Sequence, residues 1–229
     1  MMAVSVRRAL FAVLAVVSLD AFGQQNLLAN GGFENPGFFF TPGAGAGDDF
    51  RFLNSGTNSA LADWIVADNG VGQLSYIYHQ QRYPVAEGNY GLTLSEGSSI
   101  SASFQAPFSG LLNFGLNLTW SSECIVCYQP KPLEVLIDGQ VVASFAGLGS
   151  NWRYSDLTKT YSTSFSVASG THTLTLSNPE FIGNYHEYRI DQVMLTAAPV
   201  PEPEIAAMMI LGFGFMGVVA RRRRNCVAR

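Results

Sequence analysis

The residues with the clearest chemical meaning lie near the C-terminus, where a Pro-Glu-Pro tripeptide precedes an apolar run and four arginines. Pro201 and Pro203 keep the backbone around Glu202 extended, because proline fixes its own φ and disfavours a helical conformation in the preceding residue. An extended, acidic tripeptide beside a membrane is accessible to a protease. The chemistry expected here is therefore cleavage of this chain as a substrate.

The segment 205–220 is apolar, and Arg221–Arg224 follow it directly. A helix over this segment would span roughly 24 Å, slightly less than the hydrocarbon core of a bilayer, and flanking side chains can absorb the difference. Clustered arginines favour the cytoplasmic side, so the body of the protein is expected outside. An ordinary single-pass anchor that is never cut is the alternative.

This order of tripeptide, apolar segment and arginines resembles the PEP-CTERM sorting signal of Gram-negative bacteria. The resemblance implies processing by that family's membrane protease, exosortase, a transient stay in the inner membrane, and export from an exopolysaccharide-producing cell. The residues that carry it are Val200, Pro201, Glu202, Pro203, Arg221, Arg222, Arg223 and Arg224.

The N-terminus also has the pattern of a targeting segment. Arg7 and Arg8 precede the apolar stretch 9–17, and Ala21 and Gly23 are small residues at the two positions that a signal peptidase inspects. We expect Sec export, because the surroundings of the two arginines fit the twin-arginine consensus poorly. The expected parts are a signal peptide 1–23, an ectodomain 24–198, a sorting motif 199–204, a transmembrane helix 205–220 and a basic cytoplasmic tail 221–229.

The expected ectodomain is acidic and large enough for one hydrophobic core. Residues 25–199 contain six Lys and Arg against fourteen Asp and Glu, a net charge of −8. Such a surface argues against binding nucleic acid, which needs clustered positive charge. It suits an extracellular protein that binds neutral ligands or divalent cations.

Two of the three cysteines lie in the ectodomain, and Cys226 follows the basic cluster. Cys124 and Cys127 are predicted to close a small disulfide ring that braces a loop in an oxidising compartment. A redox site or a metal site is the alternative. A redox CxxC usually begins a helix, and a zinc site would need a second pair of ligands.

The body of the chain is rich in β-branched and aromatic residues, which predicts strands rather than helices. The Asp138-Gly139 and Ser169-Gly170 dipeptides are typical of tight hairpin turns. Many short strands predict an all-β fold, an antiparallel β-sandwich of the jelly-roll type. The predicted strands are 74–79, 90–94, 100–105, 112–120, 133–137, 141–145, 160–167, 171–177 and 188–196.

Four motifs resemble strands of the galactose-binding-like jelly rolls, which include carbohydrate-binding modules and DUF642-type extracellular domains. They are an opening strand at 26–34, an early strand at 62–64, a third at 87–92 and a closing strand at 188–195. The segment 38–50 departs from the family pattern and is predicted to be an inserted glycine-rich loop. In the alternative, its aromatic residues and Asp48-Asp49 lie over a ligand face or bind a cation. Trp64, in an alternating apolar context, is predicted to be buried.

The resemblance also implies a structural Ca²⁺ between the opening and closing strands. Glu34 and Asp191 would be its side-chain ligands, with carbonyls of Gly32 and near Glu87 completing the shell of oxygens that calcium requires. In the alternative, Glu34 caps a turn and Asp191 pairs with Arg189 or with a backbone amide.

A sugar site needs a flat aromatic side chain beside groups that bind hydroxyls. Trp152, in a polar stretch, is the leading candidate, with Tyr154, Trp120 and Tyr128 after it, although aromatic residues in sandwiches are more often in the core. Tyr76, Tyr78 and Tyr185 are further candidates for a ring that stacks on a sugar.

Enzymatic activity has little support in the sequence. The histidines have no nucleophile motif or metal-ligand spacing around them, and His172 shares a strand face with Leu174 and Leu176 as a packed residue would. The function expected is a non-catalytic module that binds polysaccharide, such as the producer's own exopolysaccharide. A structural component of the surface or matrix without a specific ligand is the alternative, and a glycan-acting enzyme comes third.

Overall fold

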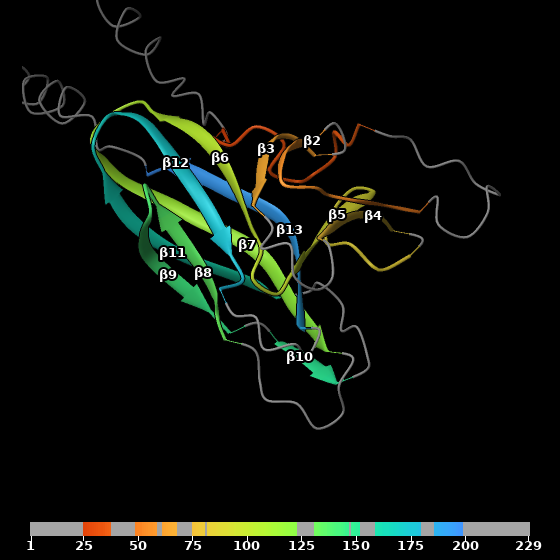
Figure 1. Ribbon diagram of the computed structural model, residues 1–229. Helices are drawn as coiled ribbons and strands as arrows, with labels where there is room; N and C mark the ends of the chain where they lie inside the picture. The colour runs from red at the N-terminus through yellow and green to blue at the C-terminus, as the bar shows by residue number, and fades with distance from the viewer. Residues whose placement is uncertain are drawn as a thin grey trace, which may run out of the picture. The chain divides into compact units, whose positions relative to one another are not determined.

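The computed structural model describes residues 25–37, 49–58, 61–67, 75–80, 82–122, 131–146, 148–151, 159–179 and 186–198. These ranges form two β-sheets packed face to face (Figure 1), as the sequence predicts. No helix within them has the length and apolar character needed to cross a membrane. The strands belong to the unit Met1–Ala197; the second unit, Ala198–Arg229, lies outside the described residues apart from Ala198.

The first sheet has seven described strands in the order β1-β4-β5-β13-β7-β10, with β11 also paired to β7. All its pairs are antiparallel except β10 with β7. The strands are β1 (Phe50–Phe52), β4 (Tyr76–His79), β5 (Tyr90–Ser95), β7 (Gly110–Ser122), β10 (Leu148–Asn151), β11 (Thr160–Val167) and β13 (His186–Ala197).

The second sheet has six described strands in the order β2-β3-β6-β12-β8-β9, all antiparallel. Figure 1 shows β6, β12 and β8 in front of β7 and β13. The strands are β2 (Gly56–Asn58), β3 (Leu61–Ala67), β6 (Ser99–Ala106), β8 (Leu133–Ile137), β9 (Gln140–Phe145) and β12 (Gly170–Ser177).

One face of each central strand lies in a core that the two sheets share, because side chains alternate along a strand. Leu92 and Leu94 of β5 meet Leu174 and Leu176 of β12 in this core. Burial of each such side chain contributes roughly 1.5–3 kcal/mol. Trp64 is also in the core, as predicted. The intervening residues of the first sheet face away from the core, and the candidate site is built from them.

All nine strands predicted from composition and alternation are present, with ends shifted by up to two residues. The opening segment 26–34 is not a strand, because Asn30 and Phe33 have positive φ and the chain turns there. The predicted loop 38–50 is wrong at its C-terminal end, where Phe50 begins β1. Residues 38–48 of that loop lie outside the described residues.

The hairpin between β8 and β9 turns at Asp138 and Gly139, whose φ values of 50° and 80° fit a two-residue type I′ turn. Asp138 also accepts a hydrogen bond from the Thr173 amide (2.9 Å) and lies 2.7 Å from Nδ1 of His172. The other ring nitrogen of His172 lies 2.9 Å from the carbonyl oxygen of Ala168. Since both neighbours are acceptors, only the protonated ring can donate to both.

The His172–Asp138 contact predicts a pH-dependent term in stability. The hydrogen bond to Asp138 raises the pKa of His172 above 6.5, so the stabilisation is complete below that pH and is lost as pH rises through the folded-state pKa. We expect the free energy of unfolding to fall by about 0.5 kcal/mol between pH 6 and 8.5, a small value because the pair is screened by solvent. Asp138→Asn, which suits the positive φ, should remove this fall in urea unfolding; an unchanged fall would contradict the assignment.

Candidate functional site

The segment that opens the ectodomain lies along the closing strand β13. The Leu27 amide donates to the carbonyl of Leu195 (2.7 Å), and the Val193 amide donates to the carbonyl of Gly31 (2.8 Å). The Asn26 side chain accepts from the Leu195 amide and donates to the Val193 carbonyl. A side chain at Gly31 would overlap that carbonyl, so the close approach of the two segments requires glycine. This contact brings Glu34 and Asp191 into one neighbourhood.

Both of these carboxylates bind the backbone of one loop, residues 82–90. Asp191 Oδ2 accepts from the amides of Ala86 (2.7 Å) and Glu87 (3.1 Å). Glu34 Oε1 accepts from the amides of Asn89 (2.8 Å) and Tyr90 (2.9 Å). Hydrogen bonds from amides to an ionised acceptor are about twice as strong as neutral ones. The loop is therefore held through four backbone donors among the five residues 86–90, with Gly88 between the two pairs.

Asp191 itself is fully buried, and burial raises its pKa to about 6. The amides of Glu87, Ala86 and Gln192 oppose this shift, while the charge of Glu34 adds slightly to it. The carboxylate remains ionised at neutral pH, and its negative charge is compensated by backbone donors. These hydrogen bonds are those of the alternative to a calcium site, in which Glu34 caps a turn and Asp191 accepts from backbone amides.

The predicted calcium site is partly assembled by this contact. Glu34 and Asp191 are close enough for their charges to interact, Gly32 lies beside Glu34, and Glu87 accepts from Nε2 of Gln192. Among the described residues, no three His, Cys, Asp or Glu side chains group closely enough to hold a metal ion. Two carboxylates and backbone carbonyls are the kinds of donor that Ca²⁺ prefers. The calcium site stays a prediction.

The 82–90 loop also carries Arg82 and Tyr83 onto the outer face of the first sheet. The Tyr83 ring lies 3.6 Å from the guanidinium carbon of Arg189, which is fully buried on β13. The Tyr78 ring of β4 lies 5.7 Å from the same carbon and meets the Tyr83 ring edge to face at 5.5 Å. The Cβ of any side chain at Gly91 would lie 2.6 Å from Oη of Tyr78, so glycine leaves room for that ring.

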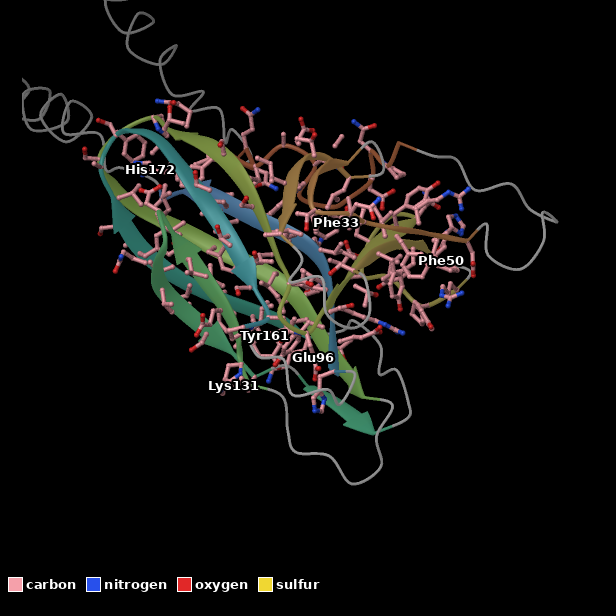
Figure 2. All side chains as sticks on the ribbon, viewed as in Figure 1. Phe33, Phe50, Glu96, Lys131, Tyr161 and His172 are labelled. Atoms are coloured by element: carbon pink, nitrogen blue, oxygen red, sulfur yellow. The ribbon has the colours of Figure 1, made fainter. Side chains whose placement is uncertain are left out.

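Phe50 and Phe52 extend this group of rings to the edge of the sheet. Their register places Phe50 opposite Tyr78 and Phe52 opposite Tyr76, so all four side chains share the outer face. Phe50 and Phe52 meet edge to face at 5.0 Å, and each also contacts Tyr76, at 5.7 and 6.1 Å. Figure 2 shows Phe50 beside β4 and β5. We call Phe50, Phe52, Tyr76, Tyr78, Arg82 and Tyr83 the aromatic surface.

Polar groups lie at the exposed end of the aromatic surface. The Arg82 guanidinium lies 4.3 Å from the centre of the Phe50 ring and 3.4 Å from the Asp49 carboxylate. Phe52 is 54% exposed, although two neighbouring rings fix its orientation. The arrangement combines an exposed ring with a donor and an acceptor that lie against its neighbour Phe50, the kinds of groups that sugar sites use.

The sequence points to different residues for ligand binding. Trp152, Tyr154 and Tyr128 lie outside the described residues, as do Cys124 and Cys127 of the predicted disulfide and the sorting residues from Val200 to Arg224. Trp120 is placed only through its backbone, which pairs with Tyr188. Tyr76 and Tyr78 are among the aromatic candidates from the sequence, and Phe50 belongs to the 38–50 stretch whose aromatic residues are the alternative for a ligand face. Phe52 was missed. The alternation Phe-Arg-Phe could have identified a short strand there.

The C-terminal tail matches a protein-family description. Residues 199–224 match the PEP-CTERM protein-sorting motif. This motif marks an exported substrate that is anchored in the membrane through its C-terminus until an exosortase processes it. Comparison with curated proteins gave no significant match.

Several solved structures of carbohydrate-binding modules resemble the sandwich distantly. A family 35 module from Clostridium thermocellum shares 14% identity over 59% of this chain and 89% of its own, with a TM-score of 0.35. The CBM61 module TmCBM61, solved with β-1,4-galactotriose, shares 14% over 76% and 100%, with a TM-score of 0.39. CBM35 from Paenibacillus barcinonensis shares 16% over 60% and 94%, with a TM-score of 0.38.

Substitution of Gly88 should destabilise the 82–90 loop that Glu34 and Asp191 hold. Its φ is +69°, and any Cβ there would overlap the Glu34 carboxyl group. Gly88→Ala is expected to lower the free energy of unfolding by roughly 2–3 kcal/mol, from backbone strain together with the displaced carboxylate. Gly139→Ala is the matched control, with φ +80° and open space around the added atom, and should cost only about 1 kcal/mol. If both variants lowered the free energy of urea unfolding equally, the contact between Gly88 and the Glu34 carboxylate would be contradicted.

The calcium prediction has its own test. If Ca²⁺ binds Glu34 and Asp191, EDTA should lower the melting temperature at pH 7.5, and Asp191→Asn should abolish that shift. The shift should shrink at pH 5, because protons compete with the metal at a carboxylate whose metal-free pKa is about 6. A melting temperature of the native chain that EDTA does not change would contradict the calcium prediction.

Proposed function

We propose that the chain is a surface or extracellular protein, sorted by an exosortase, whose sandwich is a non-catalytic module that binds polysaccharide at the aromatic surface. The observation that carries the proposal is the exposed ring of Phe52, which contacts Phe50 and Tyr76. The Phe50 ring in turn lies against the Arg82 guanidinium, which pairs with Asp49. The PEP-CTERM motif supports the export half of the proposal.

The physical basis of binding is stacking combined with hydrogen bonding. One face of a pyranose ring presents C–H groups, which pack favourably on the face of an aromatic ring. The hydroxyl groups around the sugar then need partners, because a polar group that loses water without a partner costs affinity. Arg82 supplies donors and Asp49 supplies acceptors beside Phe50, the ring that neighbours Phe52. The producer's own exopolysaccharide is the expected natural ligand.

The edge-to-face contacts of Phe52 with Phe50 and Tyr76 order its side chain before a ligand binds. Less side-chain entropy is then lost on binding. Phe52 is edge to face with both neighbours, and Phe50 is in turn stacked by Arg82. A side chain that is already ordered loses little rotamer freedom when a ligand arrives. A ring of this kind can contribute useful affinity even at an open surface.

The proposal predicts that Phe52→Ala weakens binding of the full chain, purified in detergent, to polysaccharide. Loss of one stacking partner is worth about 1–1.5 kcal/mol, which corresponds to roughly a tenfold loss in affinity. Ile65→Ala is the matched control, because Ile65 is 53% exposed, close to Phe52 at 54%, and lies on β3 of the other sheet. Affinity electrophoresis against bacterial exopolysaccharides and plant glycans, including β-1,4-galactan, gives the measurement.

The outcomes separate this site from the alternatives. Binding that survives Phe52→Ala but is lost in Trp152→Ala would move the site to the residues predicted from sequence. A negative result across the whole panel would favour a structural matrix or surface component without a specific ligand. Release of reducing sugar from any polymer would indicate a glycan-acting enzyme.

A further inference from the structure

The Asp49–Arg82 pair joins two segments at the exposed edge of the aromatic surface. Nη1 of Arg82 lies 3.4 Å from Oδ1 and 3.5 Å from Oδ2 of Asp49, and the two side chains are 32% and 24% exposed. Both distances are long for a hydrogen bond between charged groups. The pair is therefore close enough to balance its charges, while its donors and acceptors retain capacity for a ligand.

The backbone fixes both members of the pair through one residue of β4. The His79 amide donates to the carbonyl of Asp49 (2.8 Å), and the His79 carbonyl accepts from the Arg82 amide (2.9 Å). The guanidinium is further surrounded by rings, with Phe50 at 4.3 Å, Tyr83 at 5.1 Å and Tyr76 at 5.9 Å. The backbone bonds and ring contacts therefore hold Arg82 beside Asp49.

We propose that this pair makes the aromatic surface selective for uncharged sugars and that Asp49 excludes acidic polysaccharides. The inference rests on the proposed function and specifies its ligand class. A sugar hydroxyl both donates and accepts, so it can satisfy Asp49 and Arg82 together. A carboxylate or sulfate group only accepts: it could pair with Arg82, but it would lie against the negative charge of Asp49.

The wider charge distribution acts in the same direction. Residues 25–199 carry a net charge of −8, so a polyanion is repelled as it approaches. Arg82 is the cation of the aromatic surface that solvent can reach, and Asp49 already balances it. Arg189 is fully buried beneath Tyr83 and cannot contact a polymer without rearrangement. The donor and acceptor together suit neighbouring hydroxyls of a neutral pyranose.

The test compares one polymer in two charge states. The neutral polysaccharide that binds most tightly in the panel is oxidised at its primary alcohols, which converts C6 hydroxyl groups to carboxylates on the same backbone. The full chain should bind the oxidised polymer roughly tenfold more weakly than the parent in low salt, and added salt should reduce the difference. Binding of the neutral parent should change little with salt.

Asp49→Asn is the informative variant, because it removes the charge and keeps the shape. It should weaken binding of the neutral parent, because an amide is a poorer acceptor, and strengthen binding of the oxidised polymer, so the roughly tenfold preference collapses. Asp63→Asn is the control: Asp63 is exposed on β3 of the other sheet, and asparagine tolerates its φ of 70°. It lowers the net negative charge equally and should leave the preference intact.

Each outcome decides the proposal. A native chain that prefers acidic polymers overturns the selectivity while leaving polysaccharide binding in place. A preference that survives Asp49→Asn, or that Asp63→Asn removes equally, assigns the exclusion to net charge and also overturns the role of Asp49. Failure to bind any polymer, neutral or acidic, refutes the proposed function itself and the selectivity with it.

Discussion

The buried carboxylate of Asp191 is the contact on which the site depends. Placing an ionised carboxylate at zero exposure is costly, and its raised pKa reflects that cost. Three backbone amides offset it, from Ala86, Glu87 and Gln192. Each such bond to a charged acceptor is worth about 1.5–3 kcal/mol, so removing the carboxylate would leave several buried donors unsatisfied. The ends of the ectodomain and its 82–90 loop are thereby fixed together.

The aromatic surface is a consequence of this arrangement. The opening segment docks on β13, Glu34 joins Asp191 at the loop backbone, and the loop carries Arg82 and Tyr83 over the outer face of the first sheet. That face is apolar at its edge and polar toward β13, where Thr93 and Arg189 are opposite each other. Calcium, if bound, would act on the same carboxylates, so metal and sugar binding would be linked through one loop.

Much of the fold was predictable because strands of alternating character have a strong local signal. The leucines of β12 and the Asp138-Gly139 turn are examples. The prediction of a strand at 26–34 came from its resemblance to a family motif and was wrong. The segment has two positive φ values and is held to β13 by tertiary hydrogen bonds, which its residue types do not reveal. Phe52 was missed because a three-residue strand is short, so its Phe-Arg-Phe alternation does not stand out beside a glycine-rich segment. Glu34 and Asp191 were identified as a pair, but the loop backbone between them depends on tertiary contacts.

The most direct test of this account is a map of amide and arginine side-chain NMR shifts as a neutral oligosaccharide is added. The account predicts that shifts concentrate at Phe50, Phe52 and the Nε–H of Arg82, with Thr171–Ser177 on the opposite sheet unchanged. Shifts that leave β1 and the 82–90 loop unaffected while another surface responds would contradict it.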